Sequence, residues 1–311
     1  MHLTLRQIEI FQSVATAGTT AAAAVSLSLS QSATSAAINE LERLLGMQLF
    51  DRVGKRLRLN DNGIALIPLS LRLLDGAASI ERWALDRDSQ LGTLRVGAST
   101  TIGNYLLPGV LASFRDGLLE PARSNWQIQV AIANTADVAA RVAAFELDLG
   151  LIEGPCHEPD LTVLPWRDDE LVIVASPADP IVPRDRARKI PLDALRTATW
   201  LLREPGSGTQ EIVDQLLIPH LQHLRSGIAF GSSEAIKRAT ASGLGITCLS
   251  RCVVEDLLQL GELVAPNTEL PRLTRQLHIV VHARKPHTRG MDQLLHHLRA
   301  ANRTGASHTR K

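Results

Sequence analysis

The sequence predicts an α/β protein of two or more domains, with an all-α domain at its N-terminus. Its 311 residues are more than one compact core of ordinary size accommodates. Helical spacing dominates the N-terminal part, whereas apolar runs of strand length alternate with helical patterns from about residue 92 onward. Strands that alternate with helices indicate a mostly parallel sheet, and this segment is long enough to form two lobes.

Three helices are predicted in the N-terminal part. Apolar residues recur at helical spacing near the start, and Gly18 is placed to end the first helix. Thr19 and Thr20 are suitable caps for a second, alanine-rich helix. Ser30 is placed to cap a third helix, which Gly46 would end.

The third predicted helix and the basic segment after it form a winged helix-turn-helix pattern. Small polar side chains gather at the start of this helix, on the face away from Ile38 and Leu41. Such side chains and free helix N–H groups bind base edges and phosphates, and residues 51–60 add a cluster of cations. A plain amphipathic helix and an ordinary solvated hairpin are the alternatives. The residues predicted to contact double-stranded DNA are Ser30, Gln31, Ser32, Ser35, Arg52, Lys55, Arg56 and Arg58.

A long helix is predicted from residue 60 to about residue 87. Its apolar residues step by three or four positions from Leu66 to Ala84 and so form one stripe. Pro68 lies near the start, where it should kink the helix or remove one hydrogen bond. The stripe is longer than a small N-terminal domain can cover. We therefore prefer pairing with a second subunit over packing within the same domain.

Composition and charge narrow the class of protein. The net charge of +1 excludes a uniformly basic nucleic-acid-coating protein but allows a local basic patch. The chain has no apolar run of about 18 residues and no signal-peptide pattern, so we expect a cytoplasmic protein with no membrane contact. Three cysteines, an odd number, indicate reduced thiols, with a redox pair of Cys248 and Cys252 as the alternative. The ten histidines match no metal-ligand spacing, and no cofactor is expected.

Hydroxyl-rich or glycine-rich stretches follow three predicted strands and precede predicted helices, and a threonine follows a fourth strand. Ligands of open α/β sheets bind at such loops, where hydroxyl groups and helix N–H groups favour a small anion. Each stretch alone is also typical of a helix cap or a turn. Glu153 and Glu204 would oppose an anion unless they accept hydrogen bonds from hydroxyl or amine groups, so a zwitterionic ligand stays open. The residues predicted to bind this ligand are Ser99, Thr100, Thr101, Thr135, Arg203, Gly206, Ser207, Gly208, Thr209 and Ser232.

An enzyme and a solute-binding protein are the two competing functions. The GSGT segment lacks the lysine of a phosphate loop, and the sequence contains neither G-x-S-x-G nor H-E-x-x-H. No Ser-His-acid set is indicated by spacing, so no catalytic residues are predicted. A solute-binding protein would share two lobes, but the N-terminal helical segment and the lack of a signal-peptide pattern count against it. A ligand-responsive, DNA-binding regulator is therefore favoured.

The N-terminal part resembles the DNA-binding domain of the LysR-type transcriptional regulators. The resemblance rests on LRQIEIFQSVATAGT, on SQSATSAAINELERLLGMQLFDR, and on a basic wing that ends in LNDNG. The SQSA, LE-LG, LF-R and L-G elements all stand at the family's spacing, and the match covers residues 3–65 without a gap. The chain departs from the family by having Ala21 and Ala22 early in the second helix and Ala36 and Ala37 in the third. Fewer side chains should therefore reach DNA.

This resemblance implies the organisation of the whole chain. The C-terminal part would be an effector-binding domain similar in fold to two-lobed periplasmic binding proteins, with a small effector, an oxyanion or a carboxylate, between the lobes. The family forms homodimers and commonly homotetramers on double-stranded operator DNA. The expected domains are the winged helix-turn-helix (residues 1–60), the linker helix (61–90) and the effector-binding domain (91–311), with lobe I at about 92–163 and 267–300 and lobe II at about 164–266.

Overall fold

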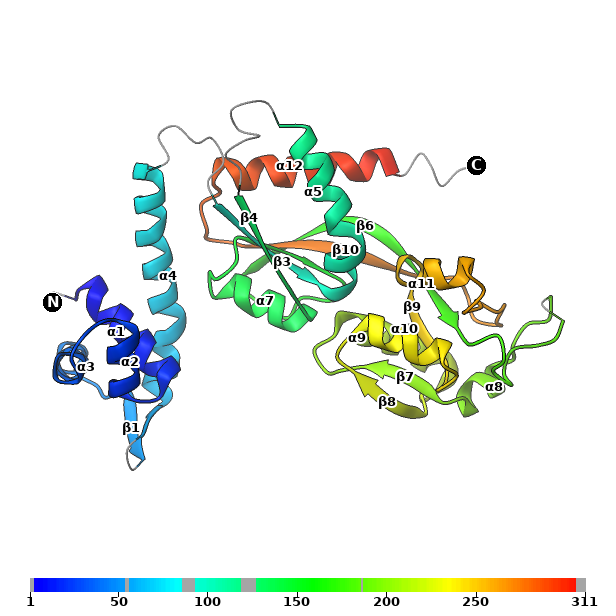
Figure 1. Cartoon of the computed structure of the whole chain (residues 1–311), viewed down its shortest axis with the longest axis horizontal. Helices are drawn as coiled ribbons and strands as arrows, with labels where there is room; N and C mark the ends of the chain where they lie inside the picture. Colours follow the sequence, from blue (N-terminus) through cyan, green and yellow to red (C-terminus); the bar gives the residue numbers. More distant parts are fainter. Residues whose placement is uncertain (1–2, 54–55, 86–92, 119–126, 186, 306–311) are drawn as a thin grey trace. The chain divides into compact units, whose positions relative to one another are not determined.

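The computed structural model describes residues 3–53, 56–85, 93–118, 127–185 and 187–305. It contains two compact units (Figure 1). The N-terminal unit comprises Met1–Asp88 with the short segment Ala144–Glu146, and the C-terminal unit comprises Ser89–Ala143 and Leu147–Lys311. Among the described residues, no helix combines the length and the apolar character that crossing a membrane requires.

The N-terminal unit begins with three helices and a two-stranded hairpin. Gly18 and Gly46 end the first and third helices in the left-handed conformation, with φ of 68° and 69°, as the sequence predicts. The hydroxyl groups of Thr19 and Ser30 accept hydrogen bonds from the first turns of the second and third helices. These elements are α1 (Leu5–Ala17), α2 (Thr20–Ser26), α3 (Gln31–Leu45), β1 (Phe50–Val53) and β2 (Arg56–Leu59).

One small core joins these elements. The Phe11 ring of α1 and the Phe50 ring of β1 lie 5.5 Å apart, and Ile8, Ile38 and Leu41 are buried beside them. Because α1, α3 and the hairpin share this core, the start of α3 and the hairpin are held in a fixed relation to one another.

The long helix α4 (Asp61–Leu85) continues through Pro68 without interruption, and its predicted end near residue 87 lies outside the described residues. Residues seven positions apart lie on nearly the same face of a helix, so Leu66, Leu73 and Ile80 form the single stripe that the sequence predicts. Leu66 packs against the core of the N-terminal unit, whereas Leu73 and Ile80 are 43% and 68% exposed. A helix that buries only the first part of an apolar stripe and exposes the rest has room for a partner.

The C-terminal unit is built on a six-stranded sheet in the order β4-β3-β5-β10-β6-β9. The prediction of a mostly parallel sheet was wrong. Only β4 and β5 pair in parallel with β3, because β10 returns from lobe II to lobe I and runs antiparallel to both its neighbours. The strands are β3 (Thr93–Ser99), β4 (Gln127–Ala133), β5 (Leu149–Ile152), β6 (Leu161–Val174), β9 (Thr247–Ser250) and β10 (Leu273–His282).

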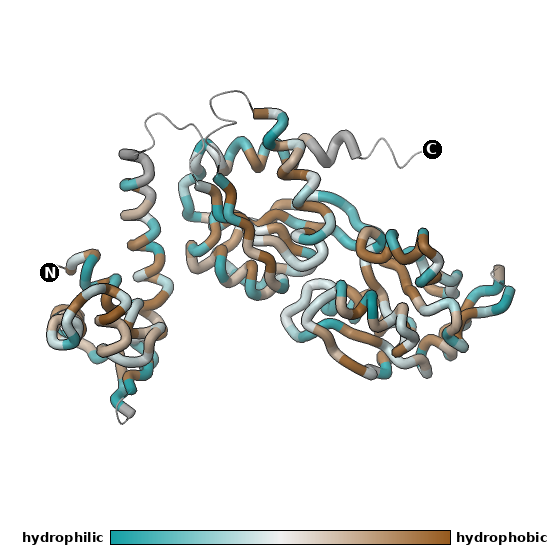
Figure 2. Tube along the Cα trace, in the orientation of Figure 1, coloured by the Kyte–Doolittle hydropathy of each residue, from teal (hydrophilic) through white to brown (hydrophobic). Residues whose placement is uncertain are grey.

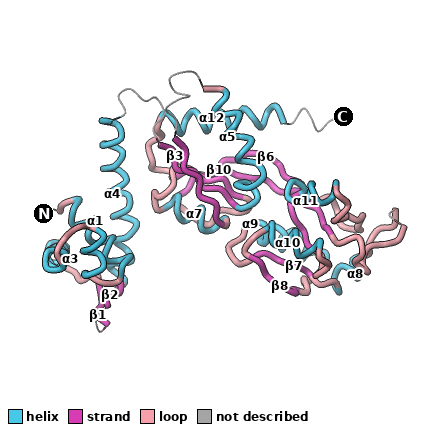
Figure 3. The backbone as a smooth tube through the Cα atoms, viewed as in Figure 1, coloured by secondary structure: helices cyan, strands magenta, loops and turns pink. Residues whose placement is uncertain are grey.

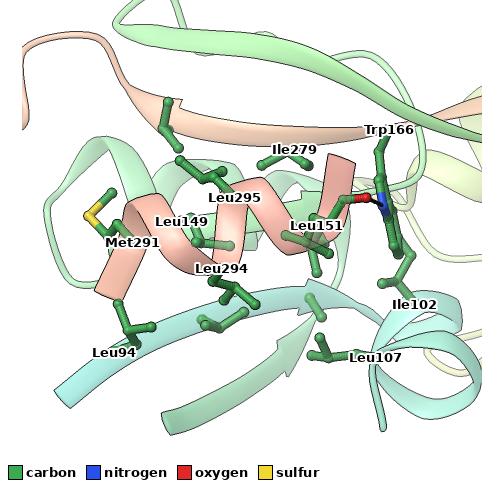
Figure 4. Close-up of a cluster of buried hydrophobic side chains, with 14 of the residues drawn as sticks. Leu94, Ile102, Leu107, Leu149, Leu151, Trp166, Ile279, Met291, Leu294 and Leu295 are labelled. Carbon is green, nitrogen blue, oxygen red and sulfur yellow. Dashed lines mark hydrogen bonds between the residues drawn. The ribbon is translucent and has the colours of Figure 1, made fainter. Parts of the chain in front are cut away.

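Lobe I has helices on both faces of its sheet, and apolar residues line its strands (Figure 2). In Figure 4, Leu294 and Leu295 of α12 face Leu149 and Leu151 of β5. The Trp166 indole closes this core by donating a hydrogen bond of 3.1 Å to a carbonyl of α12. The helices are α5 (Leu107–Asp116) and α12 (Arg289–Gly305) on this face and α7 (Thr135–Ala143) on the other.

Lobe II is formed around two short parallel strands and the far halves of β6 and β10 (Figure 3). Trp200 is fully buried in its core, to which β6 contributes Leu171 and β10 contributes Leu273. The change of lobe therefore falls inside two continuous strands. The remaining elements are α8 (Leu192–Thr197), β7 (Trp200–Arg203), α9 (Gly208–Leu221), β8 (Ser226–Phe230), α10 (Ser233–Ala241) and α11 (Arg251–Gln259).

Two glycines of α4 give a matched test of the packing in the N-terminal unit. A Cβ atom on Gly63 would lie 2.2 Å from the Leu49 carbonyl oxygen, whereas a Cβ on Gly76 would meet nothing within 4 Å. Gly63→Ala should lower the free energy of unfolding by about 1 to 3 kcal/mol. Gly76→Ala should raise it by about 0.5 to 1 kcal/mol through helix propensity alone. Urea unfolding of both variants checks this, and equal effects would contradict the packing described for α4.

Candidate functional site

The start of α3 carries the polar side chains of the first candidate surface. Gln31 and Ser32 are exposed, and Ser35 is half-buried. Ser30 is the N-cap, and its hydroxyl accepts from the Ala33 N–H at 3.1 Å and lies 3.0 Å from the Ser32 hydroxyl. Ser30 therefore has a structural role whether or not it also contacts a ligand.

The hairpin after α3 supplies the cations. Arg58 stands opposite Asp51, and Arg56 stands opposite Val53, so both arginines lie on the same face of the ribbon and both are exposed. Arg52 is opposite Leu57 and so lies on the other face, although it too is exposed. The structure brings two of the predicted arginines together and separates the third. Lys55 lies outside the described residues.

In the C-terminal unit, the predicted hydroxyl residues converge on a carboxylate. Glu153 follows β5 and is 1% exposed. One of its oxygens accepts the Thr101 backbone N–H at 2.8 Å, and the other accepts the Thr209 hydroxyl at 2.5 Å. Thr101 belongs to lobe I and Thr209 to lobe II. Glu153, which the sequence indicated only as a charge opposing an anion, thus lies at the centre of the site.

Arg275 on β10 balances this carboxylate. Its Nη1 lies 2.9 Å from Glu153 Oε2 and donates to the Thr209 hydroxyl at 2.9 Å. Its Nε pairs with Asp169 on β6 at 2.7 Å, and the Ser250 hydroxyl donates to the same carboxylate at 2.6 Å. The sequence analysis did not predict Arg275 as a site residue, although the sequence contains a pattern that indicates it. In LTRQL it occupies an inward-facing position of a buried strand, where an arginine needs partners.

The pKa values show how strongly these groups depend on one another. Burial alone would raise the pKa of Glu153, but the Arg275 charge and the hydrogen bonds to the carboxylate lower it to about 2. Burial would lower the pKa of Arg275, and the two facing carboxylates raise it instead. Glu153 and Arg275 therefore stay ionised at neutral pH as a buried charge pair.

Arg203, predicted to supply a positive charge, is committed to other contacts. Its Nη1 donates to the Thr100 hydroxyl of lobe I at 2.9 Å and to the Ser233 hydroxyl of lobe II at 2.8 Å. Its Nε and Nη2 bind both oxygens of Glu204 at 2.7 and 2.8 Å. The Arg203 charge is neutralised by its neighbour, and the side chain bridges the two lobes.

Two glycines of the GSGT segment allow the lobes to touch. A Cβ on Gly208 would lie 2.5 Å from the Thr135 hydroxyl and 2.8 Å from the Gly154 nitrogen. Gly206 has a φ of 83°, and its carbonyl accepts the Ala136 N–H of α7 at 3.1 Å. The backbone of lobe II therefore lies directly against lobe I at this point.

The remaining predicted serines divide into two kinds. Ser207 and Ser232 are the N-caps of α9 and α10 and accept from backbone N–H groups at 3.4 and 3.5 Å. Ser99 is only 2% exposed. Its hydroxyl lies near Glu153 and helps to lower the pKa of that carboxyl, but it forms no hydrogen bond of normal geometry among the described residues. The Arg275 Nη2 is likewise buried without a partner among them.

Sequence comparison decides what kind of protein carries these two surfaces. The bacterial regulatory helix-turn-helix domain of the lysR family matches residues 5–64, and the LysR substrate binding domain matches residues 87–303. The chain is a LysR-type transcriptional regulator. The members of this family regulate transcription and are not enzymes, and the predicted two-lobed α/β domain behind a winged helix-turn-helix is confirmed.

Individual relatives agree with this assignment. The chain is 45% identical to the HTH-type transcriptional regulator YeiE of Escherichia coli strain K12, over 97% of this chain and 99% of that protein. It is similar in structure to full-length CbnR, solved in complex with its target DNA, with a TM-score of 0.67, 18% identity, and coverage of 96% and 100% of the two chains. The regulatory domain of Synechocystis PCC6803 CcmR in complex with 2-PG has a TM-score of 0.60 and 28% identity, and covers 68% of this regulator and 97% of that domain.

The stability of the regulator should depend on pH through Glu153. Because the pKa of this carboxyl is lowered from an ordinary value of 4.5 to about 2, its contribution to stability is complete above about pH 4.5 and is lost as the pH falls toward 2. Denaturant unfolding between pH 7 and pH 3 should show a steeper loss for the wild type than for Glu153→Gln. Parallel curves for the two proteins would show that Glu153 does not carry this dependence.

Proposed function

We propose that this regulator binds operator DNA through the start of α3 and the β1–β2 hairpin, and that a small effector between the lobes changes the arrangement of the DNA-bound oligomer. The observation that carries the proposal is the pairing of two surfaces in one chain. One is the exposed polar start of α3, followed in the chain by exposed arginines of the hairpin. The other is the junction between the two lobes, which is lined by hydroxyl groups and where glycines allow close backbone contact. The bound DNA of CbnR and the bound 2-PG of CcmR support the two parts separately.

The DNA-binding surface has few groups that can read bases. Gln31, Ser32 and Ser35 offer the polar side chains of α3, while Ala36 offers only a methyl group to solvent. The hairpin arginines would contact phosphates, which set orientation and affinity but carry no sequence information directly. We therefore infer that specificity rests on a few base contacts together with DNA shape.

The effector site favours a small oxyanion or carboxylate held mainly by hydroxyl and N–H groups. Near Glu153, Ser99 Oγ and Arg275 Nη2 are buried donors that lack a hydrogen-bond partner among the described residues. Because Glu153 and Asp169 already outnumber the Arg275 charge, a large polyanion would be repelled. A zwitterion whose amine faces a carboxylate stays compatible with the same groups.

We base the proposed oligomer on α4, and its response to the effector on the thermodynamic coupling between effector binding and DNA binding. The exposed leucines and isoleucines of α4 are suited to pair two subunits, and we propose a homodimer that assembles further into a tetramer. If DNA and effector each favour one arrangement of that oligomer, each changes the affinity for the other by the same factor. Because the helix-turn-helix family model indicates a DNA-binding regulator, we place it in the cytoplasm.

Two substitutions separate phosphate contacts from base contacts. Arg56→Ala should weaken binding to all DNA sequences and lower the slope of log affinity against log salt by about one. Gln31→Ala should cost about 1 to 3 kcal/mol and relax the preference at one base position. Arg43→Ala is the matched control, because Arg43 pairs with Glu40 at 2.6 Å near the other end of α3. An Arg56 variant with altered base preference and an unchanged salt slope would refute these roles.

A thermal-shift screen of the full chain against sulfur, phosphorus and carboxylate anions tests the effector site. An anion that raises the melting temperature should bind Ser99→Ala more weakly by roughly five- to tenfold, the value of one hydrogen bond. Ser113→Ala is the control, because this exposed serine of α5 forms its hydrogen bonds with Val110 and His297 of the same lobe. Footprinting should then show that the same anion changes footprint length or DNA bend. A saturating anion that changes neither would rule out the proposed mechanism.

A further inference from the structure

A further polar contact joins the lobes, in addition to those that Glu153, Arg203 and Gly206 form. The segment Ser99–Thr101 leads directly into a π-helical turn, η1 (Ile102–Leu106), an uncommon element that is frequent at functional sites. This turn places the half-buried Tyr105 of lobe I against α10 of lobe II. The Tyr105 hydroxyl donates a hydrogen bond to Glu234 and accepts one from Lys237 Nζ at 3.2 Å. The same Nζ lies 5.3 Å from the centre of the Tyr105 ring.

Lobe II provides all the charged members of this cluster. Lys237 is only 2% exposed, and its Nζ lies 2.7 Å from Glu234 and 3.0 Å from Asp256. Arg238 Nε binds the other oxygen of Glu234 at 3.0 Å. Each charge therefore has an opposite charge within α10 and α11, and Tyr105 is the contribution of lobe I.

This arrangement allows the contact to break without leaving a buried charge unpaired. The side chains of Glu234 and Asp256 are 41% and 51% exposed, so water can replace the tyrosine hydroxyl, and Lys237 would keep both carboxylates. The Glu153–Arg275 pair is different, because its side chains are 2% and 0% exposed and separation would leave charges without partners in a dry site. Of these two contacts, the Tyr105 contact is thus the more easily reversible.

We propose that Tyr105, Glu234 and Lys237 form a latch that holds lobe I against lobe II. The latch lies next to two segments of the candidate effector site, since Tyr105 follows Ser99–Thr101 and Glu234 follows Ser232. A ligand that shifts either segment therefore acts directly on the latch. Burial and the hydrogen bond to Glu234 raise the pKa of Tyr105 to about 12, so the hydroxyl keeps its proton and remains a donor at neutral pH.

Hydrogen exchange in the ligand-free full chain tests the latch. The Ala136 amide donates across the junction to the Gly206 carbonyl, so its exchange reports separation of the lobes. Tyr105→Phe removes only the hydroxyl and should speed exchange at Ala136 by roughly tenfold, as expected for one hydrogen bond to a charged acceptor. Amides within β3 and β9, inside the two lobes, should keep their rates. Tyr105→Leu, which also removes the ring from beside Lys237, should give the same pattern with a larger effect.

Arg238→Gln is the matched control. It removes a partner of Glu234 within α10 but leaves the contact between the lobes intact, so exchange at Ala136 should stay at the wild-type rate. Unchanged exchange at Ala136 in both tyrosine variants would overturn the latch, and so would equal acceleration in β3, β9 and Ala136. Because the experiment uses no ligand, its outcome is separate from that of the effector screen.

Discussion

The buried pair of Glu153 and Arg275 is the interaction on which the rest of the effector domain depends. A carboxylate and a guanidinium are stable in so dry a place only because each compensates the other, and loss of one partner typically costs several kcal/mol. The pair joins the end of β5 to β10, and Thr209 adds the start of α9. The two lobes and their hydroxyl groups are thus arranged around a charge pair that neither lobe could bury alone.

The N-terminal unit was largely predictable from the sequence because its signals are local. Gly18 and Gly46 end helices, and Thr19 and Ser30 begin them, through contacts within one turn of the chain. The order of residues contains this information directly. The face on which Arg52 lies was not predictable in the same way, because it depends on which residue of β2 stands opposite it.

The effector domain was predictable in outline and not in its central chemistry. The apolar runs indicated the strands, and the loops after them were correctly expected to hold hydroxyl groups. The partners of Glu153 come from segments far away in the chain, and Arg275 reaches it only because β10 runs back beside β5 and β6. Nothing local in the sequence gives the direction of β10. Ser207 and Ser232 also illustrate the limit, since a helix cap and a ligand contact look alike in one sequence.

The two strands that run through both lobes restrict how this domain can change shape. Strands β6 and β10 form a continuous antiparallel ladder whose register shifts once, between Leu277 and His278. Sliding one lobe along the other would break many backbone hydrogen bonds at once, whereas bending at an irregular point breaks few. The main motion left to the lobes is therefore a rotation about an axis that passes through this irregular point. Effector binding would change the angle between the lobes and would move them little along each other.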